Sequence, residues 1–280
     1  MSAPSHARAQ MPLADHLREL RRRLVISIIA IAAGSVVGWI YYTQIFDVIA
    51  RPIEQVVAEA AAEGRDVRLV MSGVADAFML QVKIAAMTGL VLASPVWLYQ
   101  LWAFVTPGLH PRERRWVYVL VGVSVPLFLA GVALAYAVMP KGLEVLLGFT
   151  PENVGNYLPV DRYLSFFLRM ILVFGVGFLT PLFIVGLNIV GILSGKRLAA
   201  AWRYIIFAVF VFAAVATPTG DPVNMMLLAT PILLLVVAAV AFCLLNDRRR
   251  ARKGEPDYEQ WDDDQVSPIQ PVDDQGPTVT

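Results

Sequence analysis

Apolar residues fill six long segments of this sequence, and charged residues are concentrated between them. A helix of roughly 20 apolar residues crosses the hydrocarbon core of a bilayer, which is about 30 Å thick. The pattern therefore predicts six transmembrane helices, at residues 24–42, 78–105, 116–139, 163–190, 204–216 and 223–245. The fifth is short, and the cluster of helix-breaking residues at 217–222 predicts that it forms a tight antiparallel hairpin with the sixth.

Composition and charge placement support this interpretation and give it a direction. The chain is 58% hydrophobic and 16% charged, whereas a soluble domain has about 25% charged residues. Most of the 23 lysines and arginines fall on one side of the predicted helices, in the clusters 8–23, 112–115, 196–203 and 248–253. The opposite side holds only Arg51, Arg65, Arg68, Lys141 and Arg162. Because positive residues favour the cytoplasmic side, we expect an all-α protein of the cytoplasmic membrane with both termini inside.

The segments outside the spans carry weaker patterns. The leucines of residues 1–23 share one helical stripe, which predicts an amphipathic segment on the cytoplasmic membrane surface before the first span. That first span lacks a small-residue cleavage site, so we expect it to be retained. Within residues 43–77, apolar positions at helical spacing predict a short amphipathic helix that caps the outer face. Residues 246–280 are predicted to form a disordered cytoplasmic tail, which becomes acidic and proline-bearing after Lys253.

No pattern of a catalytic or metal-binding site is present in the sequence. His6, His16 and His110 are widely scattered, and the single cysteine, Cys243, lies in an apolar run typical of a small buried side chain. We therefore expect no enzymatic activity, no metal and no cofactor. A nucleic-acid partner is also not expected, because no soluble basic face exists to bind it.

Two acidic residues stand among arginines on the predicted cytoplasmic side: Glu19 in the sequence HLRELRRRL and Glu113 in PRERR. Each could be a local counter-charge, and an i,i+4 pair of Glu19 with Arg23 would contribute only a few tenths of a kcal/mol. Alternatively, the two carboxylates could form one site that accepts bidentate contacts from a ligand with paired arginines. The residues alone leave both interpretations open.

Three further polar residues lie within or beside the spans. Lys83 and Arg169 are inside predicted helices, where they either face protein or water or extend toward the outer interface. Asp221 is best explained as a helix N-cap, with Pro222 at the first helical position.

Several ordered motifs resemble one family. They are residues 11–24, residues 94–104 continuing into 107–115, the sequence YLSF at 163–166, residues 174–181, and Thr217-Pro218 with Asp221 and Pro231. Together they cover about residues 11–246 and are similar to TatC, the multi-spanning subunit of the twin-arginine protein translocase.

This resemblance implies a curved, concave bundle of six helices and a specific function. The family binds the twin-arginine motif of signal peptides at the cytoplasmic face, and it acts in oligomeric complexes with single-span partners of the TatA and TatB kind. Folded proteins are then exported by means of the proton-motive force.

The resemblance also implies roles for individual residues. Glu19 and Glu113 would bind the two arginines, and Phe104 and Leu109 would line the same site. A second set would shape the scaffold and the partner-docking surfaces: Pro52, Phe78, Tyr136, Thr217 and Asp221.

Two positions depart from the family pattern. Leu179 and Met225 stand where some relatives carry a polar side chain, so neither offers the corresponding contact with a partner helix. The alternative function is that of a small-solute transporter or channel, which needs midplane polar groups or broken helices along a path. The predicted first, third and sixth spans are apolar at their midplanes, which disfavours this alternative.

Overall fold

The computed structural model describes residues 13–105, 114–151, 155–217 and 222–252. These residues are mostly helical, with two short strands. In chain order the elements are α1 Leu13–Ile40, α2 Tyr42–Ala62, β1 Val67–Val70, α3 Asp76–Leu92, α4 Ser94–Val105, α5 Arg114–Gly148, β2 Asn156–Pro159, α6 Val160–Ile189, α7 Gly195–Ala200, α8 Trp202–Ala216 and α9 Pro222–Arg252.

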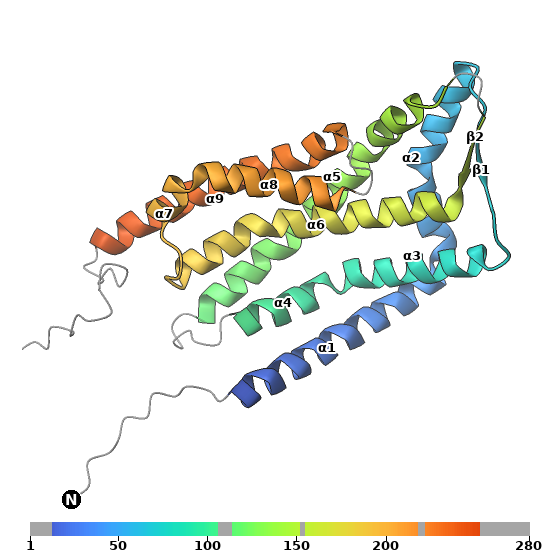
Figure 1. The fold of residues 1–280 in the computed structure, drawn as a ribbon. Helices are drawn as coiled ribbons and strands as arrows, with labels where there is room; N and C mark the ends of the chain where they lie inside the picture. The colour runs from blue at the N-terminus through green and yellow to red at the C-terminus, as the bar shows by residue number, and fades with distance from the viewer. Residues whose placement is uncertain (1–12, 106–113, 152–154, 218–221, 253–280) are drawn as a thin grey trace, which may run out of the picture.

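The long helices run back and forth between two ends of the molecule (Figure 1). The end at which α1 begins and α9 finishes is called the terminal end below, and α4 finishes and α7 lies there as well. The opposite end, called the α2 end, is closed by α2 and the two strands. The strands are parallel, with Val67 paired to Asn156 and Val70 to Pro159. This small sheet was not predicted, because two four-residue strands far apart in sequence carry no readable alternation.

Four helices of the described residues are long and apolar enough to cross a membrane, and they lie within α1, α5, α6 and α9. The predicted second span is not one straight helix, because α3 and α4 together pass the same test but are bent by 58°. Pro95 explains the bend, since it cannot donate a hydrogen bond to the carbonyl of Val91 and its ring clashes with that group. With 15 residues, α8 is shorter than each of these four helices.

Helix boundaries differ from the predictions at three places. The N-terminal segment does not turn before the first span, since α1 is continuous from Leu13 to Ile40. Pro140 does not end the third span, because α5 continues through it to Gly148; one proline removes a single hydrogen bond without ending a helix that is held by packing. The last helix extends beyond 245, to Arg252.

Small residues bring α1 and α3 into close contact. A Cβ atom on Gly89 of α3 would lie 2.6 Å from the backbone nitrogen of Ser35, and one on Gly38 of α1 would lie 2.9 Å from the Cα of Ala85. Only glycine therefore fits at these positions, and the two backbones approach as they do in small-residue helix pairs of membranes.

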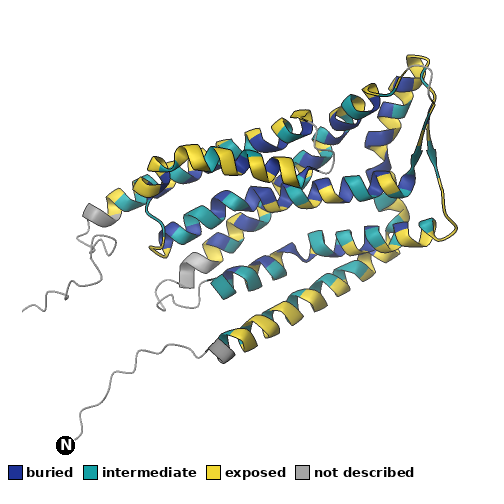
Figure 2. Ribbon diagram, viewed as in Figure 1, coloured by how far each residue is buried: buried dark blue, intermediate teal, exposed yellow. Residues whose placement is uncertain are grey.

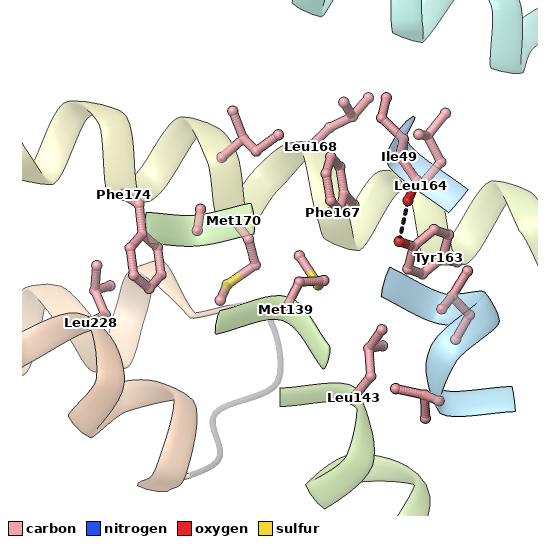
Figure 3. Close-up of a cluster of buried hydrophobic side chains, with 14 of the residues drawn as sticks. Ile49, Met139, Leu143, Tyr163, Leu164, Phe167, Leu168, Met170, Phe174 and Leu228 are labelled. Atoms are coloured by element: carbon pink, nitrogen blue, oxygen red, sulfur yellow. Dashed lines mark hydrogen bonds between the residues drawn. The ribbon is translucent and has the colours of Figure 1, made fainter. Parts of the chain in front are cut away.

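The main apolar core lies where α2, α5, α6 and α9 meet, and buried residues follow α6 along its length (Figure 2). Figure 3 shows its center, where side chains of the four helices interdigitate. The largest of them include Ile53, Met139, Leu164, Phe167, Met170 and Phe174. Within this cluster the hydroxyl of Tyr163 donates a hydrogen bond of 2.6 Å to the carbonyl of Ile49, which fastens α6 to α2.

A polar cluster fixes the terminal end of α9. The carboxylate of Asp247 accepts hydrogen bonds from the Nδ2 of Asn188 at 2.8 Å and from the backbone nitrogen of Gly195 at 2.6 Å. Asn188 is buried at the end of α6, and Gly195 begins α7. These contacts tie the last helix to α6 and α7 where the chain returns to the terminal end.

Candidate functional site: the contact between α1 and α4

Two helices from different parts of the sequence meet at the terminal end. On α1, His16, Glu19 and Arg23 share one face because they are three and four residues apart. On α4, Gln100 and Phe104 are also four residues apart. The ring of His16 stacks on that of Phe104, with centroids 4.6 Å apart and an interplanar angle of 18°. The two faces therefore form one continuous surface.

Glu19 lies at the center of this surface. Its Oε1 atom accepts two hydrogen bonds from Arg23, from Nε at 3.0 Å and from Nη2 at 2.6 Å. Arg23 also donates through Nη1 to Oε1 of Gln100 at 3.2 Å, which links α1 to α4. The Glu19 side chain is 27% exposed and that of Arg23 is 23% exposed. The predicted i,i+4 pair is therefore present, yet it is open to water.

The second carboxylate oxygen of Glu19 makes no hydrogen bond or ion pair to any part of the chain that the structure describes. A carboxylate has about four lone-pair sites, so the existing contacts leave acceptor capacity unused. An incoming guanidinium can be bound there.

The remainder of α4 is fixed firmly in the bundle, so that it presents Gln100 and Phe104 in a defined place. Trp102 is buried, donates through Nε1 to Oγ of Ser124 at 2.6 Å, and stacks on Phe183 at 4.9 Å. A Cβ atom on Gly186 would lie 2.7 Å from the Trp102 ring, which shows how closely α6 approaches. These contacts anchor α4 to α5 and α6.

Only part of the predicted site can be located. Glu19 and Phe104 lie on this surface, and His16 connects them. Glu113 and Leu109 lie outside the described residues, as does Asp221. The predicted position of Pro222 at the start of the last helix is confirmed, since α9 begins there.

The described residues among those predicted to shape the scaffold do not join this surface. Phe78 lies on α3 at the α2 end, where it makes an edge contact with Trp39 at 6.2 Å. Thr217 is buried at the end of α8, and its backbone nitrogen donates to the carbonyl of Ala213.

Pro52 and Tyr136 are brought together by a single backbone carbonyl. Pro52 lies inside α2 and has no N–H to donate to the carbonyl of Val48, one turn earlier. The hydroxyl of Tyr136 on α5 donates to that carbonyl instead, at 3.0 Å. The two residues therefore act as a pair that fastens α2 to α5.

The two cations predicted within spans have different surroundings. The Nζ of Lys83 on α3 pairs with Asp161 of α6 and donates to Oγ of Ser165 at 3.0 Å. Arg169 is exposed on α6 and has no ion pair within the described part of the chain. Lys83 therefore faces protein, as one of the two interpretations had it.

Sequence reasoning missed three residues of this surface as functional candidates: His16, Arg23 in contact with α4, and Gln100. The signal was present as matched i,i+4 spacings on two helices, but no pattern shows that the two helices are neighbours.

Among the described residues, no group of histidine, cysteine, aspartate or glutamate side chains could hold a metal ion.

The long apolar helices make the chain a membrane protein, and comparison with known sequences places it among protein translocase subunits rather than enzymes. The family model described as TatC, Sec-independent protein translocase protein, matches residues 15–231. The chain belongs to the TatC family.

Individual relatives agree with this assignment. The Sec-independent protein translocase protein TatC of Frankia casuarinae is 43% identical over 267 residues, which cover 93% of this chain and 73% of the relative. The TatC protein of Xylanimonas cellulosilytica is 39% identical over 249 residues, 89% of each chain. A crystal structure described as the twin arginine translocase receptor TatC matches with a TM-score of 0.69 and 35% identity, covering 83% of this chain and all of that one.

Proposed function

We propose that this chain is the receptor subunit of a twin-arginine translocase and that it binds twin-arginine signal peptides with the surface between α1 and α4. The observation that carries the proposal is the carboxylate of Glu19, which is partly exposed and retains an oxygen without a partner in the described residues. A similar structure carries the description of a twin arginine translocase receptor. Guanidinium groups bind carboxylates through two parallel hydrogen bonds, so Glu19 would bind one arginine of the motif.

Glu113 would supply the second carboxylate, and Leu109 would line the site together with Phe104. Phe104 is partly exposed and stacks on His16, three residues before Glu19 on α1, so it would contact apolar parts of a bound signal peptide. A signal peptide with two lysines would bind more weakly, because an ammonium group lacks the planar fork of a guanidinium.

The proposal assigns an orientation to the molecule. Six spans would cross the cytoplasmic membrane as a curved bundle, with the short α8 as the fifth, both termini inside, and the domain boundaries at about residues 23 and 245. The cations at the terminal end support this orientation, because positive residues favour the cytoplasmic side. Those of the described residues include Arg21, Arg22, Lys196, Arg203, Arg248 and Arg249.

This orientation can be tested by labelling with a membrane-impermeant thiol reagent in intact cells. Single cysteines would replace Arg68 in β1 or Lys196 in α7, since both side chains are exposed and the native Cys243 is buried. The cysteine at 68 should be labelled without lysis and the cysteine at 196 only after lysis. The reverse pattern would contradict the orientation.

The partners would be single-span proteins of the TatA and TatB kind, recruited after the signal peptide has bound. The hairpin of α8 and α9 would receive their transmembrane helices, because α8 exposes large apolar side chains: Tyr204 at 78%, Phe207 at 69% and Val215 at 82%. Pro52, Phe78, Tyr136, Thr217 and Asp221 would hold the scaffold on which this hairpin and several copies of the chain assemble. The proton-motive force would drive export, and an uncoupler should therefore stop it in vesicles.

The binding site itself is tested by photo-crosslinking. A photoreactive side chain at position 104 should crosslink to a twin-arginine signal peptide, whereas the same side chain at Phe78, which is 58% exposed at the α2 end, should not. The double change Glu19→Gln and Glu113→Gln should abolish the crosslink at 104 while leaving membrane insertion normal. An unchanged crosslink in this variant would refute the carboxylate site.

A further inference from the structure

The contacts of Arg23 point to a role that the proposed function does not include. Arg23 makes three hydrogen bonds, two to a single oxygen of Glu19 and one to Gln100. We propose that Arg23 is an internal stand-in for the arginine of a signal peptide, which occupies Glu19 in the empty receptor and sets the threshold for binding. This inference rests on the proposed function, because it assumes that Glu19 binds the ligand.

The geometry supports a stepwise exchange. Both N–H groups that Arg23 gives to Glu19 end on Oε1, so a ligand guanidinium can first contact Oε2. A bidentate contact needs both oxygens, so the ligand then has to displace at least one hydrogen bond of Arg23. Ligand and Arg23 therefore compete for the same carboxylate.

Exchange is feasible because the resident pair is weak. The side chains of Glu19 and Arg23 are about one quarter exposed, and pairs that water reaches contribute little to stability. Water and a ligand can both reach the carboxylate without unfolding α1.

Gln100 is a second hydrogen-bond acceptor for Arg23. Its amide oxygen lies 3.2 Å from Nη1 of Arg23, on α4 rather than α1. A displaced Arg23 therefore keeps one hydrogen bond and does not leave its donors unpaired. Since a neutral amide is a weaker acceptor than a carboxylate, Arg23 prefers Glu19 when no ligand is bound.

The stand-in contributes to specificity. A ligand must compete with a guanidinium that already makes a two-point contact, and only another guanidinium can match that geometry. An ammonium cannot. Arg23 would thus reject lysine-bearing signals more strongly than Glu19 alone does.

Arg23 could instead support ligand binding, and the two roles predict opposite changes in ligand affinity when Arg23 is removed. If Arg23 only orients the carboxylate of Glu19, removing it weakens ligand binding. If Arg23 competes with the ligand, removing it strengthens binding.

The test is a titration of the full-length purified protein, reconstituted in lipid nanodiscs, with a fluorescent twin-arginine signal peptide and its Lys-Lys counterpart. Arg23→Gln should lower the Kd of the twin-arginine peptide about two- to fivefold, the range expected from a partly exposed ion pair. It should lower the Kd of the Lys-Lys peptide more, so that the preference for arginine falls. Arg23→Lys, which keeps the charge but loses the fork, should change both in the same direction.

Two further variants give matched controls. Arg22→Gln removes the same charge from an exposed neighbour on α1, so it measures the general electrostatic effect that Arg23→Gln must exceed. Gln100→Leu removes the alternative acceptor and should raise the Kd of the twin-arginine peptide about two- to fivefold. In an Arg23→Gln background the effect of Gln100→Leu should vanish, because the two residues act through one contact.

The inference is overturned if Arg23→Gln and Arg23→Lys weaken binding of the twin-arginine peptide, or if Arg23→Gln matches Arg22→Gln. Failure of the proposed function has a different signature, in which Glu19→Gln binds both peptides as the unmodified chain does. Thermal unfolding of each variant, followed by tryptophan fluorescence, shows whether it is folded.

Discussion

The two ends of the molecule are held together by different kinds of contact. At the α2 end, two tyrosine hydroxyls donate hydrogen bonds to backbone carbonyls of α2, and α2 shares a buried apolar core with α5, α6 and α9. At the terminal end, α1 meets α4 through a ring stack and through polar side chains that water can reach. Backbone carbonyls cannot be exchanged for a ligand, whereas side-chain partners can.

The helices α6 and α1 differ in how far they are buried in the bundle. In the most apolar part of α6, 56% of the residues are buried, whereas in that of α1 only 6% are. The helix α1 is attached chiefly along α3 by small residues, and it carries Glu19 in its first turns, where it meets α4. The comparison indicates a closely packed scaffold around α6 and a peripheral helix that would supply the proposed binding surface. Changes in the scaffold should therefore affect stability, and changes in α1 should affect binding.

The largest expected effect comes from separating α1 from α3. In Gly89→Leu the new side chain would overlap Ser35 and the backbone of α1, so α1 should shift and carry Glu19 away from Gln100. Overpacking of this kind costs about 1–3 kcal/mol, and the affinity for a twin-arginine peptide should fall by about tenfold or more. Peptide titration and thermal unfolding measure both effects.

Gly122→Leu is the matched control for this change, because a Cβ atom on Gly122 would have no neighbour within 4 Å. It should leave the affinity unchanged. If Gly89→Leu behaved like Gly122→Leu, the close packing of α1 on α3 would be irrelevant to the binding surface.

A smaller effect, on stability but not on peptide affinity, is expected when the scaffold is altered at Tyr163. Tyr163→Phe removes the hydroxyl that binds the carbonyl of Ile49 and so removes this buried hydrogen bond between α6 and α2, which costs about 1.5 kcal/mol, the upper end for a net hydrogen bond. The melting temperature should fall while peptide affinity stays within twofold. A loss of affinity without a loss of stability would reverse the proposed division between the two ends.

Tyr136→Phe should cost somewhat less, about 1 kcal/mol, because its acceptor on Val48 lies at a partly exposed position. The cost depends on Pro52, which withholds the usual backbone donor from that carbonyl. In a Pro52→Ala background the helix can supply this donor again, so the cost of Tyr136→Phe should shrink. Equal costs in both backgrounds would show that the two residues are not coupled.

The smallest effect is expected for the ion pair between α3 and α6. Both partners, Lys83 and Asp161, are about one third exposed, so solvent screening limits the contribution of the pair to roughly 1 kcal/mol or less. Lys83→Met should lower the melting temperature slightly. The charge-swapped variant, Lys83→Asp with Asp161→Lys, keeps an ion pair and should therefore melt close to the temperature of the unmodified chain. A large loss of stability would mean that the pair lies in a far less polar environment than its exposure indicates.

Much of the fold could be predicted from hydrophobic runs, because each long helix buries apolar residues in protein or lipid. The amphipathic helix predicted within residues 43–77 is α2, and its apolar positions Ile49, Ile53 and Val56 are buried as expected. The bend at Pro95 and the continuation of α5 through Pro140 could not be told apart by sequence, since a proline either bends or ends a helix according to the packing around it.

Of the described residues of the candidate site, the charge pattern indicated only Glu19 as a ligand-binding residue, and the family resemblance added Phe104. Glu19 stood out because a carboxylate among arginines is conspicuous, and its pairing with Arg23 follows from a spacing of four. The roles of His16 and Gln100 depend on which helix lies beside α1, and this is decided by glycines on α1 and α3. Long-range packing of that kind leaves no local pattern.

The central claim is that Glu19 binds an arginine of the signal peptide, and the most direct measurement is the affinity of reconstituted protein for twin-arginine and Lys-Lys peptides, with and without Glu19→Gln. The account predicts that this change weakens twin-arginine binding by about 10- to 100-fold, the value of a hydrogen bond to a charged group, and removes the preference over Lys-Lys. Unchanged affinity and unchanged preference in Glu19→Gln would contradict it.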